Sequence, residues 1–224
     1  MPSLVGSEMC IRDSGYNGTT PIELSEMIPF GRAVASSAVS ALVVVDLPFG
    51  SYEVSDDQAL TNSIRVIKET GADAVKLEGA KLSQIRALVS SGIPVMGHVG
   101  FTPQSVNTLA GYKVQGRTEQ DAARILQECK DIEAAGAFAV VLEMIPAELA
   151  RDISQKLAIP TIGIGAGADC DGQILVWQDF AGLGTRSPKF AKQYLNLRQD
   201  LSAAATAFRN EVVAGEFPAP EQQF

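Results

Sequence analysis

Residues 73–98, DAVKLEGAKLSQIRALVSSGIPVMGH, decide the fold class. They contain two short, nearly continuous apolar runs, DAVKLE (73–78) and IPVMGH (93–98), and between them a segment of helical periodicity that ends at Gly92. Continuous runs of this kind are typical of strands buried on both faces, as in parallel sheets. A glycine after an amphipathic segment indicates a helix C-cap. The stretch therefore predicts a strand–helix–strand unit with parallel strands.

The same alternation extends in both directions along the chain. Further strands are predicted at ALVVVD (41–46), FAVVLE (138–143), IPTIGI (159–164) and QILVW (173–177), and further helices at 56–71, 118–136 and 146–158. The first two of these helices end in glycine, at Gly71 and Gly136. Strict alternation over this length predicts a parallel α/β fold, and a (β/α)8 TIM barrel fits best. The Gly-rich segment GIGAGADCDG (163–172) lies between two strands, which disfavours a nucleotide-binding open sheet.

The two ends of the chain do not follow the alternation. We predict no strand before residue 41, so the barrel is expected to lack its first two strands. Residues 1–14, MPSLVGSEMCIRDS, have no periodicity and are interpreted as a foreign or disordered leader. Residues 15–224 are then the incomplete barrel domain. The segment 188–218 has helical spacing and predicts two C-terminal helices joined by a turn, packed outside the barrel.

Composition excludes several classes of function. The formal net charge of -8 argues against nucleic acid as a partner, because phosphate binding needs a basic surface. No stretch approaches the roughly 20 apolar residues of a membrane helix, and no secretory signal precedes the first elements. The three cysteines, Cys10, Cys129 and Cys170, have no paired spacing, which fits a reducing compartment. We therefore expect a cytoplasmic protein without membrane or nucleic-acid partners.

Ionisable side chains lie near the ends of four consecutive predicted strands: Asp46, Lys76 with Glu78, His98, and Glu143. Each acid alone has a simpler explanation, because acidic residues often cap the turn after a strand. Four strands in a row favour a shared active site, since the carboxyl ends of barrel strands form one catalytic face and buried charge is costly without a ligand or partner.

The residue types predict distinct roles at this site. Asp46 and Glu78 are oxygen donors suited to Mg²⁺. Lys76 could neutralise a substrate carboxylate, and Glu143 could carry a proton. His98 is the only histidine, which excludes a multi-histidine zinc site and leaves both a structural and a functional role open for it. No serine or cysteine belongs to an evident nucleophilic triad.

Several motifs resemble the ketopantoate hydroxymethyltransferase family, in order from about residue 17 to the C-terminus. These motifs are DLPFGSY (46–52), GADAVKLEG (71–79), GIPVMGHVGFTPQSV (92–106), GYKVQGR (111–117), FAVVLEMIPAELA (138–150), IPTIGIGAG (159–167), DGQILVWQD (171–179) and PKFAKQYL (188–195). The resemblance implies a barrel of the phosphoenolpyruvate/pyruvate superfamily acting in pantothenate biosynthesis. It implies hydroxymethyl transfer from 5,10-methylenetetrahydrofolate to 3-methyl-2-oxobutanoate, giving 2-dehydropantoate, with Mg²⁺. A homo-oligomer, a decamer in bacteria, is implied as well.

The resemblance also implies roles for individual residues. Asp46 would bind both metal and substrate, Glu78 the metal, Lys76 and His98 the substrate, and Glu143 would transfer protons. The family's first metal aspartate and its adjoining serine have no counterpart here, and Asp13-Ser14, in the leader, is not carried over to that role. We therefore expect an incomplete metal shell and an impaired, N-terminally truncated enzyme.

Two other interpretations stay open. One is a different Mg²⁺-dependent carbon–carbon bond enzyme of the same superfamily, against which GYKVQGR (111–117) and GHVGFTPQSV (97–106) argue. The other is a non-catalytic or degenerate barrel subunit.

Overall fold

The computed structural model describes residues 3–5, 15–108, 111, 113–185 and 187–224, in two compact units, 1–174 and 175–224. The first unit is built on a sheet in which the described strands are all parallel and follow one another in chain order. The strands are β1 (Ser3–Val5), β2 (Val43–Asp46), β3 (Ala74–Lys76), β4 (Val95–Gly100), β5 (Ala139–Glu143), β6 (Thr161–Ile164) and β7 (Gly172–Gln173).

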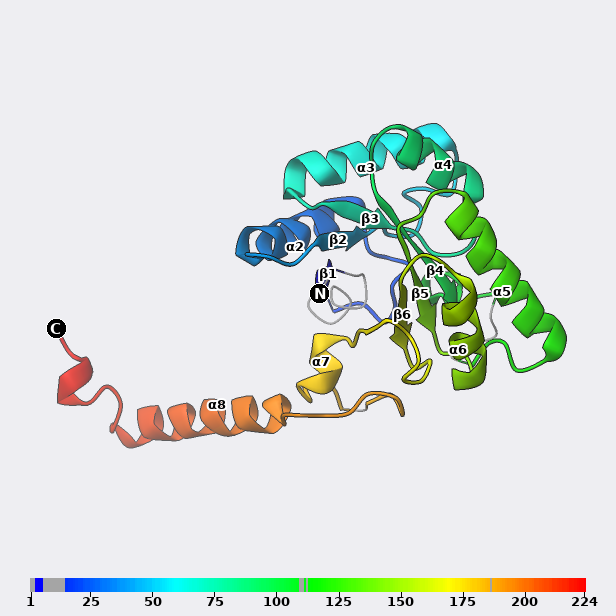
Figure 1. Ribbon diagram of the computed structural model, residues 1–224. Coiled ribbons are helices and arrows are strands. Elements are labelled where there is room, and N and C mark those ends of the chain that lie inside the picture. The colour runs from blue at the N-terminus through cyan, green and yellow to red at the C-terminus, as the bar shows by residue number, and fades with distance from the viewer. Residues whose placement is uncertain (1–2, 6–14, 109–110, 112, 186) are drawn as a thin grey trace. The chain divides into compact units, whose positions relative to one another are not determined.

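Helices connect these strands and lie along the outer side of the curled sheet (Figure 1). They are α2 (Leu24–Ser37), α3 (Asp56–Thr70), α4 (Leu82–Ser90), α5 (Glu119–Ala134) and α6 (Ala147–Lys156), with the short 3₁₀ helix η1 (Pro103–Ser105) after β4. Each helix packs against the next one in the chain, α2 on α3 through to α5 on α6. Successive strand–helix units around a curled parallel sheet are the arrangement of an α/β barrel, so the predicted fold class is confirmed.

Local sequence explains where the helices begin and end. Ser55 is the N-cap of α3, and its side chain accepts a hydrogen bond from the Gln58 N–H at 3.1 Å. Gly71 ends the same helix in the left-handed conformation, with φ of 77°. Gly92 and Gly136, which follow α4 and α5, also have positive φ. The three predicted glycine stops are therefore confirmed.

The sheet separates a hydrophobic core from the polar site. Val43, Val45 and Val75 belong to one apolar cluster with buried residues of the helices, such as Val66 and Ile85. Because successive side chains along a strand point to opposite faces, the alternating residues face the other side of the sheet. Those residues are Val44 and Asp46 in β2, Ala74 and Lys76 in β3, and Met96 and His98 in β4, all buried. The polar residues thus share the face turned away from the helices.

Five of the six predicted strands correspond to β2–β6. The sixth is shorter and earlier than predicted, because β7 covers only Gly172–Gln173 and Trp177 already begins a helix. The expectation of no strand before residue 41 was wrong, since Ser3–Val5 pairs in parallel with Val43–Val45. This strand lies inside the segment interpreted as a leader. Asp13 and Ser14 lie outside the described residues, and the domain division at residue 15 stays a prediction.

The second unit contains α7 (Trp177–Phe180), α8 (Leu197–Ala214) and the 3₁₀ helix η2 (Pro220–Gln222). Two helices were expected within residues 188–218, whereas the structure has one α-helix there. The residues that precede α8 do not form a second α-helix. Instead, the N–H groups of Tyr194 and Leu197 donate to the carbonyls of Phe180 and Ala181, at 2.8 and 2.9 Å. Within the described part of the chain, no helix is both long enough and apolar enough to span a membrane.

Candidate active site

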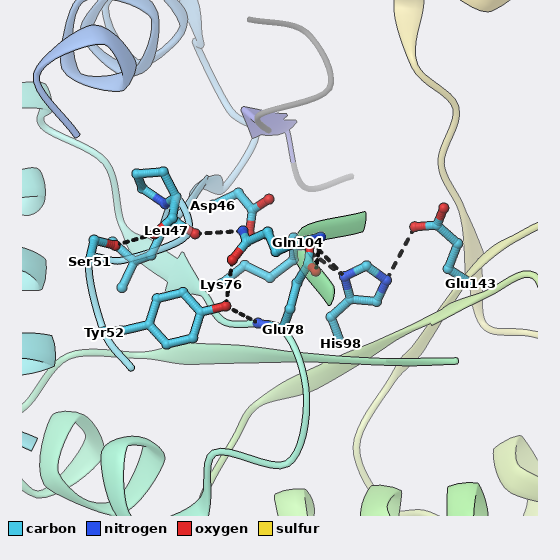
Figure 2. A network of polar contacts seen from close by, with 10 residues as sticks. Asp46, Leu47, Ser51, Tyr52, Lys76, Glu78, His98, Gln104 and Glu143 are labelled. Carbon is cyan, nitrogen blue, oxygen red and sulfur yellow. Dashed lines mark hydrogen bonds and ion pairs between the residues drawn. The ribbon is translucent and has the colours of Figure 1, made fainter. Parts of the chain in front are cut away.

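The five predicted site residues come together on the polar face of the sheet, at the carboxyl ends of β2–β5 (Figure 2). Asp46, Lys76 and Glu143 are the last residues of β2, β3 and β5. Glu78 lies two residues beyond β3. His98 lies inside β4, which continues to Gly100 and so does not end at the histidine as predicted. Asp46 and Lys76 are direct partners in the β2–β3 register.

A continuous line of polar contacts joins these side chains across four strands. Lys76 Nζ lies 2.8 Å from Asp46 Oδ1 and 3.1 Å from His98 Nδ1. On the other side of the imidazole ring, His98 Nε2 lies 3.2 Å from Glu143 Oε2. Glu78 Oε1 lies 3.8 Å from His98 Nδ1. Apart from Glu143, whose side chain is 13% exposed, these side chains are almost fully buried.

These contacts imply one protonation state for His98. Lys76 carries only donors, so its contact requires Nδ1 to be an acceptor. The ring proton is then on Nε2, the nitrogen that lies 3.2 Å from Glu143 Oε2, an assignment inferred from the contacts. Burial and the positive charge of Lys76 hold the pKa of His98 well below its usual range. A neutral imidazole thus links a fixed cation to a carboxylate.

The backbone around Glu143 is held on both sides. The Phe101 N–H donates to Glu143 O at 2.8 Å, and the Met144 N–H donates to Ile164 O at 2.9 Å. Gly100 makes the first contact possible, because a Cβ there would lie 2.2 Å from Glu143 O. Met144 has a φ of 47°, a left-handed conformation that is uncommon outside glycine. Backbone strain of this kind persists only where the surrounding structure enforces it. The left-handed conformation of Met144 turns the chain immediately after Glu143.

Two residues that sequence reasoning missed surround Glu78 (Figure 2). Gln104 donates its backbone N–H to Glu78 Oε2 at 2.9 Å, and Tyr52 accepts a hydrogen bond from the Glu78 N–H at 3.2 Å. Burial and the neighbouring Glu78 carboxylate raise the pKa of Tyr52 far above its ordinary value, so its hydroxyl stays protonated. Both lie inside motifs of the family resemblance, but away from the strand ends at which the charged residues of the site can be recognised in the sequence.

Comparison with known proteins identifies the family of this chain. The sequence model of ketopantoate hydroxymethyltransferase matches residues 2–220. The 3-methyl-2-oxobutanoate hydroxymethyltransferase of Thermobifida fusca is 53% identical over 223 residues, which are 99% of this chain and 80% of that protein. The chain belongs to the ketopantoate hydroxymethyltransferase family. A relative of the same name from Streptomyces coelicolor is 52% identical over 97% of this chain and 76% of its own length.

Solved structures of more distant proteins share the fold of this hydroxymethyltransferase family member. Phosphoenolpyruvate phosphomutase from Streptomyces platensis superposes with a TM-score of 0.59 at 16% identity, covering 97% of this chain and 79% of its own. A 2,3-dimethylmalate lyase, a member of the PEP mutase/isocitrate lyase superfamily, gives 0.55 at 16% identity, covering 97% and 77%. At these identities the likeness shows the fold alone.

The donor set near Asp46 and Glu78 fits Mg²⁺. Both carboxylates are buried, at 0% and 2% exposure; Asp46 ends β2, and Glu78 follows the adjacent strand β3. Among the described residues, no group of three or more His, Cys, Asp or Glu is arranged to hold a metal ion. Mg²⁺ commonly takes only one or two carboxylates and completes its shell with water and substrate oxygens. Asp46 and Glu78 are therefore two oxygen donors of the kind that Mg²⁺ takes.

Proposed function

We propose that this chain transfers a hydroxymethyl group from 5,10-methylenetetrahydrofolate to 3-methyl-2-oxobutanoate, giving 2-dehydropantoate. The family and the names of its relatives support this reaction. The observation that carries it is the line of contacts from Asp46 through Lys76 and His98 to Glu143, which joins a cation to an acid–base group. A 2-oxo acid needs both: a positive charge for its carboxylate, and a base for its C–H.

Lys76 binds the substrate carboxylate in this proposal. Its ammonium is buried, and Asp46 and His98 hold it at 2.8 and 3.1 Å, so its position is set before the substrate arrives. A prearranged charge of this kind loses little free energy to reorganisation on binding. Asp46, the direct neighbour of Lys76 in the sheet, then lies beside the substrate as well.

Glu143 removes the proton from C3 of the oxo acid. Water adds to the methylene group carried by folate, and its two C–N bonds break to release formaldehyde and tetrahydrofolate. The C3 carbanion then adds to the formaldehyde carbon, whose oxygen takes up a proton and becomes the new hydroxyl. His98 lies against the base, because its Nε2 is 3.2 Å from Glu143 Oε2. The depressed pKa of His98 keeps the ring neutral, so Glu143 faces a neutral ring and not a full positive charge. A carboxylate without a paired cation is the stronger base.

Asp46 and Glu78 are the residues that would hold Mg²⁺. When bound, the ion supplies Lewis-acid polarisation of the substrate oxygens, which makes the neighbouring C–H more acidic. A phosphonopyruvate hydrolase of the same fold, with a TM-score of 0.57 at 12% identity over 98% of this chain and 80% of its own, was solved in complex with oxalate and Mg²⁺.

Product formation tests this proposal. The chain is incubated with 3-methyl-2-oxobutanoate, 5,10-methylenetetrahydrofolate and Mg²⁺, and 2-dehydropantoate is measured by mass spectrometry. We expect folate-dependent formation that Glu143→Gln abolishes. Equal product with wild type and Glu143→Gln would contradict the role of Glu143. Turnover of phosphonopyruvate in place of the oxo acid would favour a different enzyme of the superfamily.

Assembly and location complete the proposal. The resemblance favours a homo-oligomer, a decamer in bacterial relatives, and the unpaired cysteine pattern favours the cytoplasm. Light scattering of the purified chain measures the first of these directly.

A further inference from the structure

A closed ring of hydrogen bonds joins the three loops that follow β2, β3 and β4 (Figure 2). The Tyr52 hydroxyl donates to Gln104 Oε1 at 2.6 Å and accepts from the Glu78 N–H at 3.2 Å. The Gln104 N–H closes the ring by donating to Glu78 Oε2 at 2.9 Å. All three side chains are buried, at 1%, 2% and 4% exposure for Tyr52, Glu78 and Gln104.

The ring is anchored to the end of β2 by the amide of Gln104. Its Nε2 donates to Leu47 O at 2.8 Å, and Leu47 directly follows Asp46. Its Oε1 is the acceptor for Tyr52, so both ends of the side-chain amide are in use. A buried hydrogen bond is strengthened by its neighbours and is costly to leave unmade, so a ring of them fixes each member.

The member that matters for chemistry is the Glu78 carboxylate. Its Oε1 lies 3.8 Å from His98 Nδ1, the atom that Lys76 Nζ contacts at 3.1 Å. An ammonium so near attracts the carboxylate, and a flexible glutamate would turn toward it. The bond from the Gln104 N–H to Oε2 opposes that rotation, and the Tyr52 hydroxyl holds the Glu78 backbone in place.

We propose that Tyr52 and Gln104 are positioning residues that fix the Glu78 carboxylate so that it binds a divalent cation and does not collapse onto Lys76 and His98. This inference rests on the proposed function only in assigning Glu78 to Mg²⁺. Tyr52 lies six residues beyond the end of β2, and Gln104 lies four residues beyond the end of β4. Each therefore reaches Glu78 from a different loop.

Tyr52→Phe tests the proposal because it removes the hydroxyl and little else. Mg²⁺ binding is measured by calorimetry, and Mn²⁺ binding by electron paramagnetic resonance. Loss of a residue that orients a metal ligand typically weakens affinity about 10–100-fold, and we expect a loss in this range. Tyr16→Phe is the matched control. It removes a hydroxyl that lies away from the site and donates to Glu26 Oε1 at 2.9 Å, and it should leave the affinity for both ions unchanged. Equal affinity in wild type and Tyr52→Phe overturns the proposal.

A second readout does not depend on metal. The amide hydrogen of Gln104 donates to Glu78, so its exchange in D₂O, followed by NMR, reports whether the carboxylate is held. We expect clearly faster exchange in Tyr52→Phe and no change in Tyr16→Phe. Gln104→Met, which keeps the backbone N–H and loses the bonds to Tyr52 and Leu47, should act in the same direction.

The two readouts separate this inference from the proposed function. A wild-type chain that binds neither ion contradicts the metal assignment of the proposed function, and amide exchange then decides the positioning role. Unchanged exchange at Gln104 in both Tyr52→Phe and Gln104→Met overturns that role whatever the metal does.

Discussion

Replacing Lys76 with methionine removes the cation that joins Asp46 to His98 and keeps a side chain of similar length. The ammonium lies 2.8 Å from Asp46 Oδ1, and the two side chains are 3% and 0% exposed. At an effective dielectric constant of about 20, two unit charges at that separation attract by ~6 kcal/mol. Desolvation of both groups offsets part of this attraction, and breaking one partner of a buried pair typically costs ~3–5 kcal/mol. We therefore expect Lys76→Met to lower the free energy of unfolding by about 4 kcal/mol.

This change is measured by urea denaturation, followed by circular dichroism. EDTA is present so that Mg²⁺ does not replace the lost charge. Lys156→Met is the matched control, because Lys156 Nζ lies 2.7 Å from Asp152 Oδ2 with both side chains nearly half exposed. An exposed pair contributes less than ~1 kcal/mol. The double variant Asp46→Asn/Lys76→Met should recover much of the loss, since the buried carboxylate is then neutralised. If Lys76→Met loses no more than Lys156→Met, the reasoning about the buried pair is refuted.

Three further changes probe the same site. Gly100→Ala should cost about 3 kcal/mol in urea denaturation, because its Cβ would lie 2.2 Å from Glu143 O; a loss below about 1 kcal/mol would contradict that close contact. Met144→Gly should be neutral within about 1 kcal/mol, since relief of the left-handed strain offsets the entropy of glycine; Met144→Val should be clearly destabilising, and equal stability of the two would argue against strain. The pKa of His98 is lower in the folded chain than in the unfolded chain. Below a pH of about 6.5, His98 therefore binds a proton in the unfolded chain while it stays neutral in the folded chain. Stability should therefore be complete above that pH and fall on acidification, and His98→Asn should show a smaller fall between pH 7.5 and 5; parallel curves would contradict the buried neutral ring.

The four strands that carry the site, β2–β5, could be predicted because each is a buried apolar run ending near a charged residue. Their side-chain direction followed from the strand period, which explains why Asp46, Lys76 and His98 share one face. The short strand Ser3–Val5 was missed because three residues are too few to show a pattern, and it forms by pairing with β2, far along the chain. QILVW (173–177) was misjudged because an apolar run does not by itself separate a strand from other buried segments.

Long-range contacts account for the remaining differences. Residues 188–196 have helical spacing, but hydrogen bonds from Tyr194 and Leu197 to the carbonyls of Phe180 and Ala181, at the end of α7, override it. The roles of Tyr52 and Gln104 depend on hydrogen bonds between loops that are 26 or more residues apart in sequence. No local signal contains such pairings. The sequence could identify the charged members of the site, whereas the residues that orient them required the structure.

The most direct test of the account follows the hydrogen at C3 of 3-methyl-2-oxobutanoate in D₂O. Proton NMR measures its exchange with solvent in the presence of Mg²⁺, without folate, so that only the first half of the proposed reaction is observed. The account predicts that the chain accelerates this exchange, because Lys76, His98 and Glu143 are already assembled, and that Glu143→Gln returns it to the rate in buffer. Exchange that is no faster than in buffer, or that is equally fast in Glu143→Gln, would contradict it.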